Sequence, residues 1–237
     1  MNALTRSFSA IWNSSLGKKY IVALTGIVMF LFLAGHLAGN LLVFVGKDAF
    51  NGYALFLHKT AHGMGVWVAR AVLLASLVAH VAATISLTIQ NRSAREQYQN
   101  KDTIQASRSS RIMMWTGLTI LAFIIYHLLH FTARFANDYG SYVDPQYYEE
   151  TGIERPDAWR MVIEGFSWFP AVFFYMVALT MLCSHLSHGV SSTFQTLGFR
   201  SKKSQDLIRC GGKIYAFVIW AGFMSMPIAI YFFKFGR

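Results

Sequence analysis

Five long apolar runs, separated by short polar segments, dominate the pattern of this chain of 237 residues. Four of them contain no Asp, Glu, Lys or Arg, and the other contains only Arg70. Each run is near or above the roughly 20 residues that a helix needs to cross about 30 Å of hydrocarbon. Runs of this length favour helices over the alternating strands of a membrane barrel. We therefore predict an all-α integral membrane protein with five transmembrane helices, at about residues 20–45, 66–90, 112–133, 166–190 and 214–233.

The composition supports a membrane protein and indicates one domain. The chain is 54% hydrophobic and 14% charged, whereas a soluble domain carries roughly a quarter charged residues. The first run is too long for the core of a signal peptide and lacks an Ala-x-Ala-like cleavage site, so we expect a retained helix. No linker or repeat is visible, and residues 1–237 are predicted to form a single transmembrane domain with loops too short for a soluble catalytic domain.

The distribution of charge predicts the orientation of the helices. Segments 1–19, 91–111 and 191–213 together hold 13 Lys or Arg and 3 acidic residues, whereas segments 46–70, 134–165 and the carboxy-terminal tail hold 8 of each. An excess of positive charge marks the cytoplasmic side of a membrane protein. The amino terminus is therefore expected in the cytoplasm, and the net charge of +10 is interpreted as a topology signal rather than as a nucleic-acid surface.

Histidines are the unusual feature of the apolar runs. The chain has eight, and six lie within the first four predicted helices: His36, His80, His127, His130, His185 and His188. An ionisable side chain in a spanning segment is costly and by default indicates function. Neutral imidazoles on facing helices could hold the iron of a b-type haem as paired axial ligands. A proton or ion relay and a transition-metal site are alternatives, although the apolar cores offer no carboxylate to a metal.

Counting residues from the basic ends of the helices sorts four histidines into two pairs. His36 and His127 lie 17 and 16 residues after the basic residue that precedes their helix, a difference in depth of about 1.5 Å. His80 and His188 each lie 12 residues before an arginine that follows their helix. Two level pairs predict two stacked haems in a bundle of the first four helices, an outer one at His36 and His127 and an inner one at His80 and His188. A proton relay requires no such pairing.

The other two intramembrane histidines, His130 and His185, are each three residues from a proposed ligand and lie on an adjacent face of the same helix. We interpret both as structural groups or as hydrogen-bond partners of haem propionates. Small residues surround His36 and His80, in AGHLAGN and VAHVAAT. Such residues would let a flat macrocycle, or a neighbouring helix, approach the backbone closely.

The two cysteines, Cys183 and Cys210, belong to no C-x-x-C or C-x-x-C-H motif. The sequence therefore predicts neither a disulfide framework nor covalent attachment of haem. Both thiols are interpreted as small apolar side chains.

Four stretches occur in order along the chain: FLAGHLAGN, LVAHVAATI followed by a basic loop with AREQY, YHLLHF, and HLSHGVSSTFQTLGF. By their order, spacing and topology they resemble the di-haem cytochrome b subunit of succinate:quinone oxidoreductases. This is the succinate dehydrogenase and fumarate reductase group whose membrane anchor is one five-helix chain. The resemblance spans nearly the whole chain, and HLSHGVSSTFQTLGF is its best single stretch.

The resemblance implies axial haem ligands at His36, His80, His127 and His188, in agreement with the count of depth. It implies two haems b as cofactors, a quinone substrate that is commonly menaquinone, and the cytoplasmic (inner) membrane of a bacterium. It also implies two partners on the cytoplasmic face, a flavoprotein with covalent FAD and an iron–sulfur subunit. The chain has no dinucleotide fingerprint and no cluster cysteines of its own, which fits a subunit that passes electrons between those partners and the quinone.

One position departs from some members of this group. Certain di-haem fumarate reductases carry a glutamate two residues before the ligand on the fourth helix, where it serves proton movement across the membrane. This chain has Leu186 there. A coupled proton path of that design is therefore not expected.

A quinone site is expected at the outer ends of the first two predicted helices, beyond the haem at His36 and His127. A quinone needs an apolar slot, a donor for each carbonyl and a route for two protons, to which histidine is suited. His58 and His62 stand at helical spacing in the outer loop and could also bind a metal ion. An interfacial belt of aromatic and basic residues is the alternative interpretation. The candidate residues are Asn40, Tyr53, His58, His62, Trp67 and Arg70.

Two other functions compete with this one. A cytochrome b anchor of a membrane hydrogenase or formate dehydrogenase shares paired histidines on several helices, but the fourth-helix stretch and the five-helix order fit it less well. A haem-free transporter with a histidine relay is the second alternative. A visible absorption spectrum separates the transporter from both cytochromes, and the identity of the co-purifying soluble subunits separates the cytochromes from each other.

Overall fold

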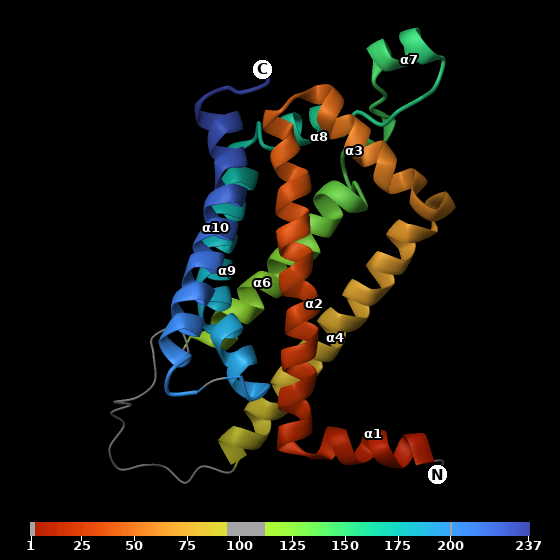
Figure 1. The fold of residues 1–237 in the computed structure, drawn as a ribbon. Coiled ribbons are helices and arrows are strands. Elements are labelled where there is room, and N and C mark those ends of the chain that lie inside the picture. The colour runs from red at the N-terminus through yellow and green to blue at the C-terminus, as the bar shows by residue number, and fades with distance from the viewer. Residues whose placement is uncertain (1–2, 94–111, 200) are drawn as a thin grey trace.

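The computed structural model describes residues 3–93, 112–199 and 201–237. In this part of the chain five helices are long and apolar enough to cross a membrane, which confirms the predicted all-α transmembrane class (Figure 1). Helices satisfy their own backbone hydrogen bonds, which is what an apolar segment in hydrocarbon requires. The five helices are α2 (Ser15–Leu41), α4 (Met64–Ser93), α6 (Met113–His127), α9 (Phe169–Thr196) and α10 (Gln205–Phe232).

The ends of these helices differ from the predicted ends. α9 continues to Thr196, beyond the predicted end at about residue 190, and α10 begins at Gln205 rather than at about residue 214. α2 is extended by a short 3-10 turn, Leu42–Phe44, and α6 by a wider π-type turn, Leu128–Thr132. Hydropathy detects only the apolar part of a helix, whereas its hydrogen bonding continues into polar residues on either side.

The described residues also form four shorter α-helices: α1 (Ala3–Asn13), α3 (Lys47–Lys59), α7 (Pro145–Thr151) and α8 (Ala158–Gly165). α1 lies within the amino-terminal segment 1–19, and α3 lies within the predicted outer loop after the first transmembrane helix. α1 lies across the beginning of α2, and a side chain at Gly17 would collide with the carbonyl of Ile11 (Figure 1). The close approach of α1 to the first turn of α2 therefore requires glycine at position 17.

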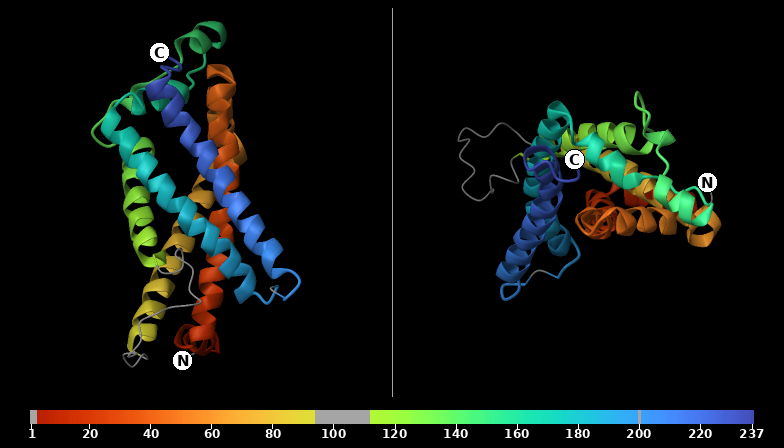
Figure 2. Two further views of the ribbon diagram at one scale, coloured as in Figure 1. Left: turned by 90° about the vertical axis from the view of Figure 1, so that its left-hand side faces the viewer. Right: turned by 90° about the horizontal axis from the view of Figure 1, so that it is seen from above.

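The long helices form a bundle in which α9 and α10 pack together along their length (Figures 1 and 2). α2 packs against α4 and α9, and α6 packs against α9. We call the end of the bundle that carries α1 the α1 end, and the opposite end, which carries α3, α7 and α8, the α8 end. Gly222 lets α10 approach α2, because a Cβ there would lie only 2.7 Å from Leu37 Cδ1.

Between α4 and α6 lies an open groove of about 460 Å³. All its lining side chains are aliphatic: Leu74, Leu77, Val78, Val81, Ala82 and Ile85 of α4, and Leu121, Ile124, Ile125 and Leu128 of the α6 segment. This volume falls within the range of small-molecule sites. The bundle is therefore tightly packed on the α9–α10 side and open between α4 and α6.

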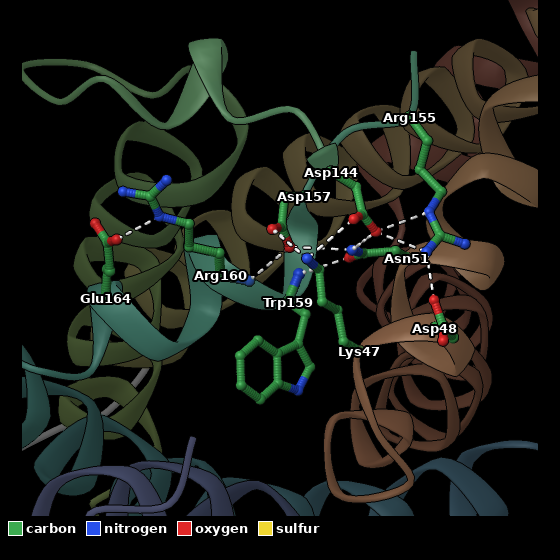
Figure 3. A network of polar contacts seen from close by, with 9 residues as sticks. All are labelled: Lys47, Asp48, Asn51, Asp144, Arg155, Asp157, Trp159, Arg160 and Glu164. Carbon is green, nitrogen blue, oxygen red and sulfur yellow. Dashed lines mark hydrogen bonds and ion pairs between the residues drawn. The ribbon is translucent and has the colours of Figure 1, made fainter. Parts of the chain in front are cut away.

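A buried polar network closes the α8 end (Figure 3). Asp144 accepts hydrogen bonds from Arg155 and Asn51, and Lys47 lies 2.9 Å from its other oxygen. Asn51 also donates to Asp157 and accepts from the backbone N–H of Trp159. Because Lys47 and Asn51 belong to α3, these bonds fix α3 to the segment that carries α7 and α8.

The segment 94–111, together with Arg200, lies outside the described residues. The predicted basic loop 91–111, most of its charge and its AREQY stretch fall there. Two of the basic residues from which depth was counted, Arg111 and Arg200, also fall there. The predicted orientation of the amino terminus remains a prediction.

Candidate functional site

Two histidines from different helices meet near the α8 end of the bundle. The rings of His36 on α2 and His127 on α6 have centroids 6.0 Å apart, with an angle of 84° between their planes. Phe32 stacks on His36 at 5.1 Å, and Phe223 of α10 lies 5.7 Å from it. The pair is thus enclosed by aromatic side chains and is supplied by helices that are distant in the sequence.

This separation fits two axial ligands of one iron. Bonds of about 2.0 Å from a metal to each imidazole nitrogen place the two ring centres roughly 6 Å apart. A haem iron needs only two protein ligands, because the porphyrin supplies the others. The described residues contain no group of three or more His, Cys, Asp or Glu side chains that could hold a bare metal ion. The spacing of the two imidazoles is therefore compatible with a bis-histidine haem site, and their role as a ligand pair remains a prediction.

A tyrosine hydroxyl joins the two histidines of α6. Tyr175 Oη on α9 lies 3.1 Å from His127 Nδ1 and 3.3 Å from His130 Nδ1. His130 sits in the π-type turn that extends α6, stacked on Phe131 with centroids 4.1 Å apart. His127 and His130 thus share one partner, although sequence spacing had placed them on adjacent faces.

Two further histidines, nearer the α1 end, each lie against a threonine of a neighbouring helix. His80 Nδ1 on α4 lies 3.1 Å from Thr25 Oγ1 on α2, and His185 Nδ1 on α9 lies 3.2 Å from Thr116 Oγ1 on α6. Both hydroxyls donate to backbone carbonyls of their own helices, so they are free to accept from an imidazole N–H. In the tautomer whose Nδ1–H donates to the threonine, the Nε2 lone pair of each ring is left available.

The pairing of His80 with His188 stays a prediction. In the described part of the chain their rings make no direct contact of the kind that joins His36 and His127. His185 lies close enough to both of them for the three rings to belong to one region. A Cβ on Gly26 would lie 3.8 Å from His80 Cε1 and 3.7 Å from Thr193 Oγ1, which places His80 beside the part of α9 that follows His188.

The small residues around His36 divide into two kinds. No atom lies within 4 Å of the point where a Cβ on Gly35 would stand, and Ala34 and Ala38 are exposed. Gly39, in contrast, is in contact with the ring of Tyr53, and a side chain there would collide with it. Gly35 leaves open space next to His36, whereas Gly39 serves the packing of α2 against α3.

The candidate quinone residues are spread over two places. Asn40 donates to the carbonyl of His36 over 2.8 Å and lies 3.3 Å from its Nδ1, so it belongs to the surroundings of the His36 ring. His58 and His62 are exposed, at the end of α3 and in the 3-10 turn Thr60–Gly63 that joins it to α4. Trp67 and Arg70 are exposed too, with the guanidinium 4.9 Å from the ring centre.

These four residues, His58, His62, Trp67 and Arg70, lie on α3, on α4 and in the turn between them. His58 and His62 were expected in a loop, and this expectation was wrong for His58, which lies on α3. The backbone of His62 is left-handed, with φ of 56°, and that of Ala61 before it has φ of 50°. Non-glycine residues rarely adopt this conformation, so the turn is strained.

A row of polar rings leads from the surface of the α8 end to His130. The hydroxyl of Tyr142 donates to Glu164 over 2.5 Å, and Arg160 donates to the other carboxylate oxygen over 2.6 Å. The hydrogen bond to Glu164, together with burial and the negative charge of that carboxylate, raises the pKa of Tyr142 to about 12. The ring of Tyr139 lies 5.6 Å from that of Tyr142 and 5.8 Å from that of His130.

Several residues of this site were not anticipated from the sequence, namely Thr25, Thr116, Tyr175 and the buried network of Asn51, Asp144 and Arg155. Thr25, Thr116 and Tyr175 are hydroxyl groups within apolar helices, and a search for such groups would have found them. It would not have shown which histidine each one contacts. Leu186 occupies the position at which the sequence analysis noted a glutamate in some di-haem fumarate reductases. Its side chain is buried in the core among Leu182, Ala216 and Ile219.

No protein-family model, curated protein or solved structure matches this chain.

Proposed function

We propose that this chain is the cytochrome b membrane anchor of a succinate dehydrogenase or fumarate reductase in the cytoplasmic membrane of a bacterium. The observation that carries the proposal is the meeting of His36 and His127, whose ring centroids lie 6.0 Å apart. The order of the four histidine-bearing stretches supports it as well. The haem near the α8 end would be held by His36 and His127, and the haem near the α1 end by His80 and His188. Two haems b bound there supply one-electron transfer between an iron–sulfur partner and a membrane quinone.

The side chains of the protein hold and shield such a site. Thr25 accepts from His80 Nδ1 and so leaves the Nε2 lone pair of that ring available, which is the usual way in which an outer partner orients a metal-bound histidine. Phe32 and Phe223 cover part of the His36 ring.

The α1 end is the side on which the soluble partners would dock. By the excess of basic residues in its sequence segments this end would be cytoplasmic, and the amphipathic helix α1 lies across it (Figure 1). An iron–sulfur subunit bound there would be nearer to the His80 and His188 site than to the His36 and His127 site. The quinone site would lie at the α8 end, near His58 and His62, where α3 and α4 carry exposed donor groups.

A haem assay on the isolated complex tests the proposal. The complex is purified through this chain, its visible spectrum and pyridine haemochrome are recorded, and the co-purifying subunits are identified by mass spectrometry. Two non-covalent haems b per chain, both low-spin and six-coordinate, are expected together with a flavoprotein and an iron–sulfur protein. A colourless complex would favour the histidine-relay transporter, and hydrogenase or formate dehydrogenase subunits would favour the other cytochrome anchor. A single haem would contradict the four-ligand arrangement.

A further inference from the structure

Tyr175 is the most enclosed polar side chain among the intramembrane aromatic residues near the α8 end. It is 4% exposed, and its ring meets Phe123 and Phe166 edge to face, each at a centroid distance of 4.9 Å. These contacts fix the plane of the ring and therefore the position of its hydroxyl. That hydroxyl stands between His127 Nδ1 at 3.1 Å and His130 Nδ1 at 3.3 Å.

Two arrangements of the protons let the Tyr175 hydroxyl accept from one histidine and donate to the other. A tyrosine hydroxyl has one hydrogen to donate and lone pairs to accept, and a neutral imidazole has one N–H and one lone pair. In the first arrangement His127 Nδ1–H donates to Tyr175 and the hydroxyl donates to His130 Nδ1. In the second arrangement His130 Nδ1–H donates to Tyr175 and the hydroxyl donates to His127 Nδ1. Only the first leaves a lone pair on His127 Nε2, and it places the single N–H of His130 at its own Nε2.

We infer that Tyr175 is a positioning residue that holds His127 ready to bind iron through Nε2 and withholds this role from His130. The inference rests on the proposed function and adds to it a residue that touches neither iron nor quinone. The hydroxyl fixes the orientation of the His127 ring and, through the direction of its own O–H, fixes the tautomer of His130. The first arrangement is the one that fits the proposed site, because His127 and not His130 lies against His36, at a centroid distance of 6.0 Å.

The hydrogen bond to Tyr175 also acts on the iron site that His127 would serve. A ligating imidazole that donates its other N–H becomes a stronger electron donor, and this stabilises the ferric state over the ferrous state. Removing the acceptor should therefore raise the reduction potential of one haem, the one bound by His36 and His127. A residue that only fills space would not produce a shift confined to one haem.

The test uses the intact complex with Tyr175→Phe, which keeps the ring and its packing and deletes only the hydroxyl. Haem content, the midpoint potential of each haem and the low-temperature electron paramagnetic resonance signals are measured. We expect two haems, a changed signal from one of them and a rise in its potential. A tenfold change in the ferric-to-ferrous preference corresponds to about 59 mV for one electron. Tyr126→Phe is the matched control, since its ring packs against Tyr175 at 5.9 Å, and it should shift neither potential.

A second variant keeps the inference testable if Tyr175→Phe does not assemble. His130→Ala removes the acceptor of the Tyr175 O–H and weakens the hydroxyl as a partner of His127, so the same haem should shift in the same direction while both haems stay bound. Unchanged potentials and signals in either variant, with two haems present, would overturn the role of Tyr175 and leave the proposed function standing. Absence of haem from the unmodified complex would overturn both.

Discussion

Arg155 and Asp144 form an ion pair that is shielded from solvent, with Arg155 Nη2 2.6 Å from Asp144 Oδ2 and the two side chains 6% and 1% exposed. The same guanidinium also reaches Asp48, which is 88% exposed. One arginine thus joins a buried and an exposed carboxylate, and only the buried one is also bound by Lys47 and Asn51 (Figure 3). The two carboxylates provide a matched pair for measuring what the network contributes to stability.

Asp144→Asn should strongly destabilise the α8 end. Removing one member of a buried ion pair leaves the other charge unpaired and typically costs about 3 kcal/mol. Asp48→Asn changes an exposed carboxylate on the same arginine, and it should alter stability by no more than about 0.5 kcal/mol. Thermal unfolding of the detergent-solubilised protein measures both. Equal effects of the two variants would contradict the assignment of Asp144 as the buried anchor.

The same network predicts how stability depends on pH. Burial alone would raise the pKa of Asp144, but hydrogen bonds from Arg155, Lys47 and Asn51 outweigh it and hold this pKa well below the usual range. A depressed folded-state pKa gives stability that is fully present above the unfolded-state value of about 4 and is lost as the pH falls further. The melting temperature of the unmodified protein should therefore fall more steeply below about pH 4 than that of Asp144→Asn. Parallel curves would show that Asp144 does not carry this dependence.

His36→Ala and His127→Ala should each remove the same haem, because the two rings face each other across 6.0 Å and loss of either leaves the iron with one axial ligand. His58→Ala changes an exposed histidine outside the pair and should leave both haems bound. Haem content by pyridine haemochrome, with spectra that distinguish the two haems, measures the outcome. Retention of both haems in His127→Ala would show that the pairing is wrong.

His188→Ala and His80→Ala should each remove the haem near the α1 end, whereas His185→Ala should leave both haems bound. The contacts around Gly26 place His80 beside the part of α9 that follows His188, and His185 lies a further turn towards the α8 end. Thr25→Val should keep both haems but shift the potential of this one, since it removes the partner of His80 Nδ1. If His185→Ala removed a haem and His188→Ala did not, the two roles would be exchanged.

His62→Ala, and to a smaller extent His58→Ala, should lower quinone-dependent turnover and spare turnover with a soluble acceptor that bypasses the haems. A general acid–base group contributes on the order of 10²-fold to such a reaction. Haem content serves as the control and should not change. Unaltered quinone reduction in both variants would move the quinone site to the α1 end, close to the iron–sulfur partner.

One part of the candidate site could be predicted from the sequence, and another part could not. Depth along a helix follows from residue counts, so His36 and His127 could be matched before their rings were placed at 6.0 Å. Rotation about the helix axis is not fixed by such a count. The contacts of Tyr175 with His127 and His130, and those of Thr25 with His80, depend on that rotation and on helix tilt. A hydroxyl group in an apolar run indicates that it has some hydrogen-bond partner, but not which residue that partner is.

The sequence by itself determined the five membrane-spanning helices, because a long run without charge can satisfy its backbone in hydrocarbon only as a helix. It also determined which ionisable groups lie within those helices, and hence the choice of haem as the leading hypothesis. Only the tertiary structure decided that Lys47, Asn51 and Arg155 surround Asp144, that α3 and α8 are joined, and that one tyrosine serves two histidines. These arrangements bring together residues that are far apart in the chain. They depend on how the helices pack, and neither hydropathy nor spacing records how one helix faces another.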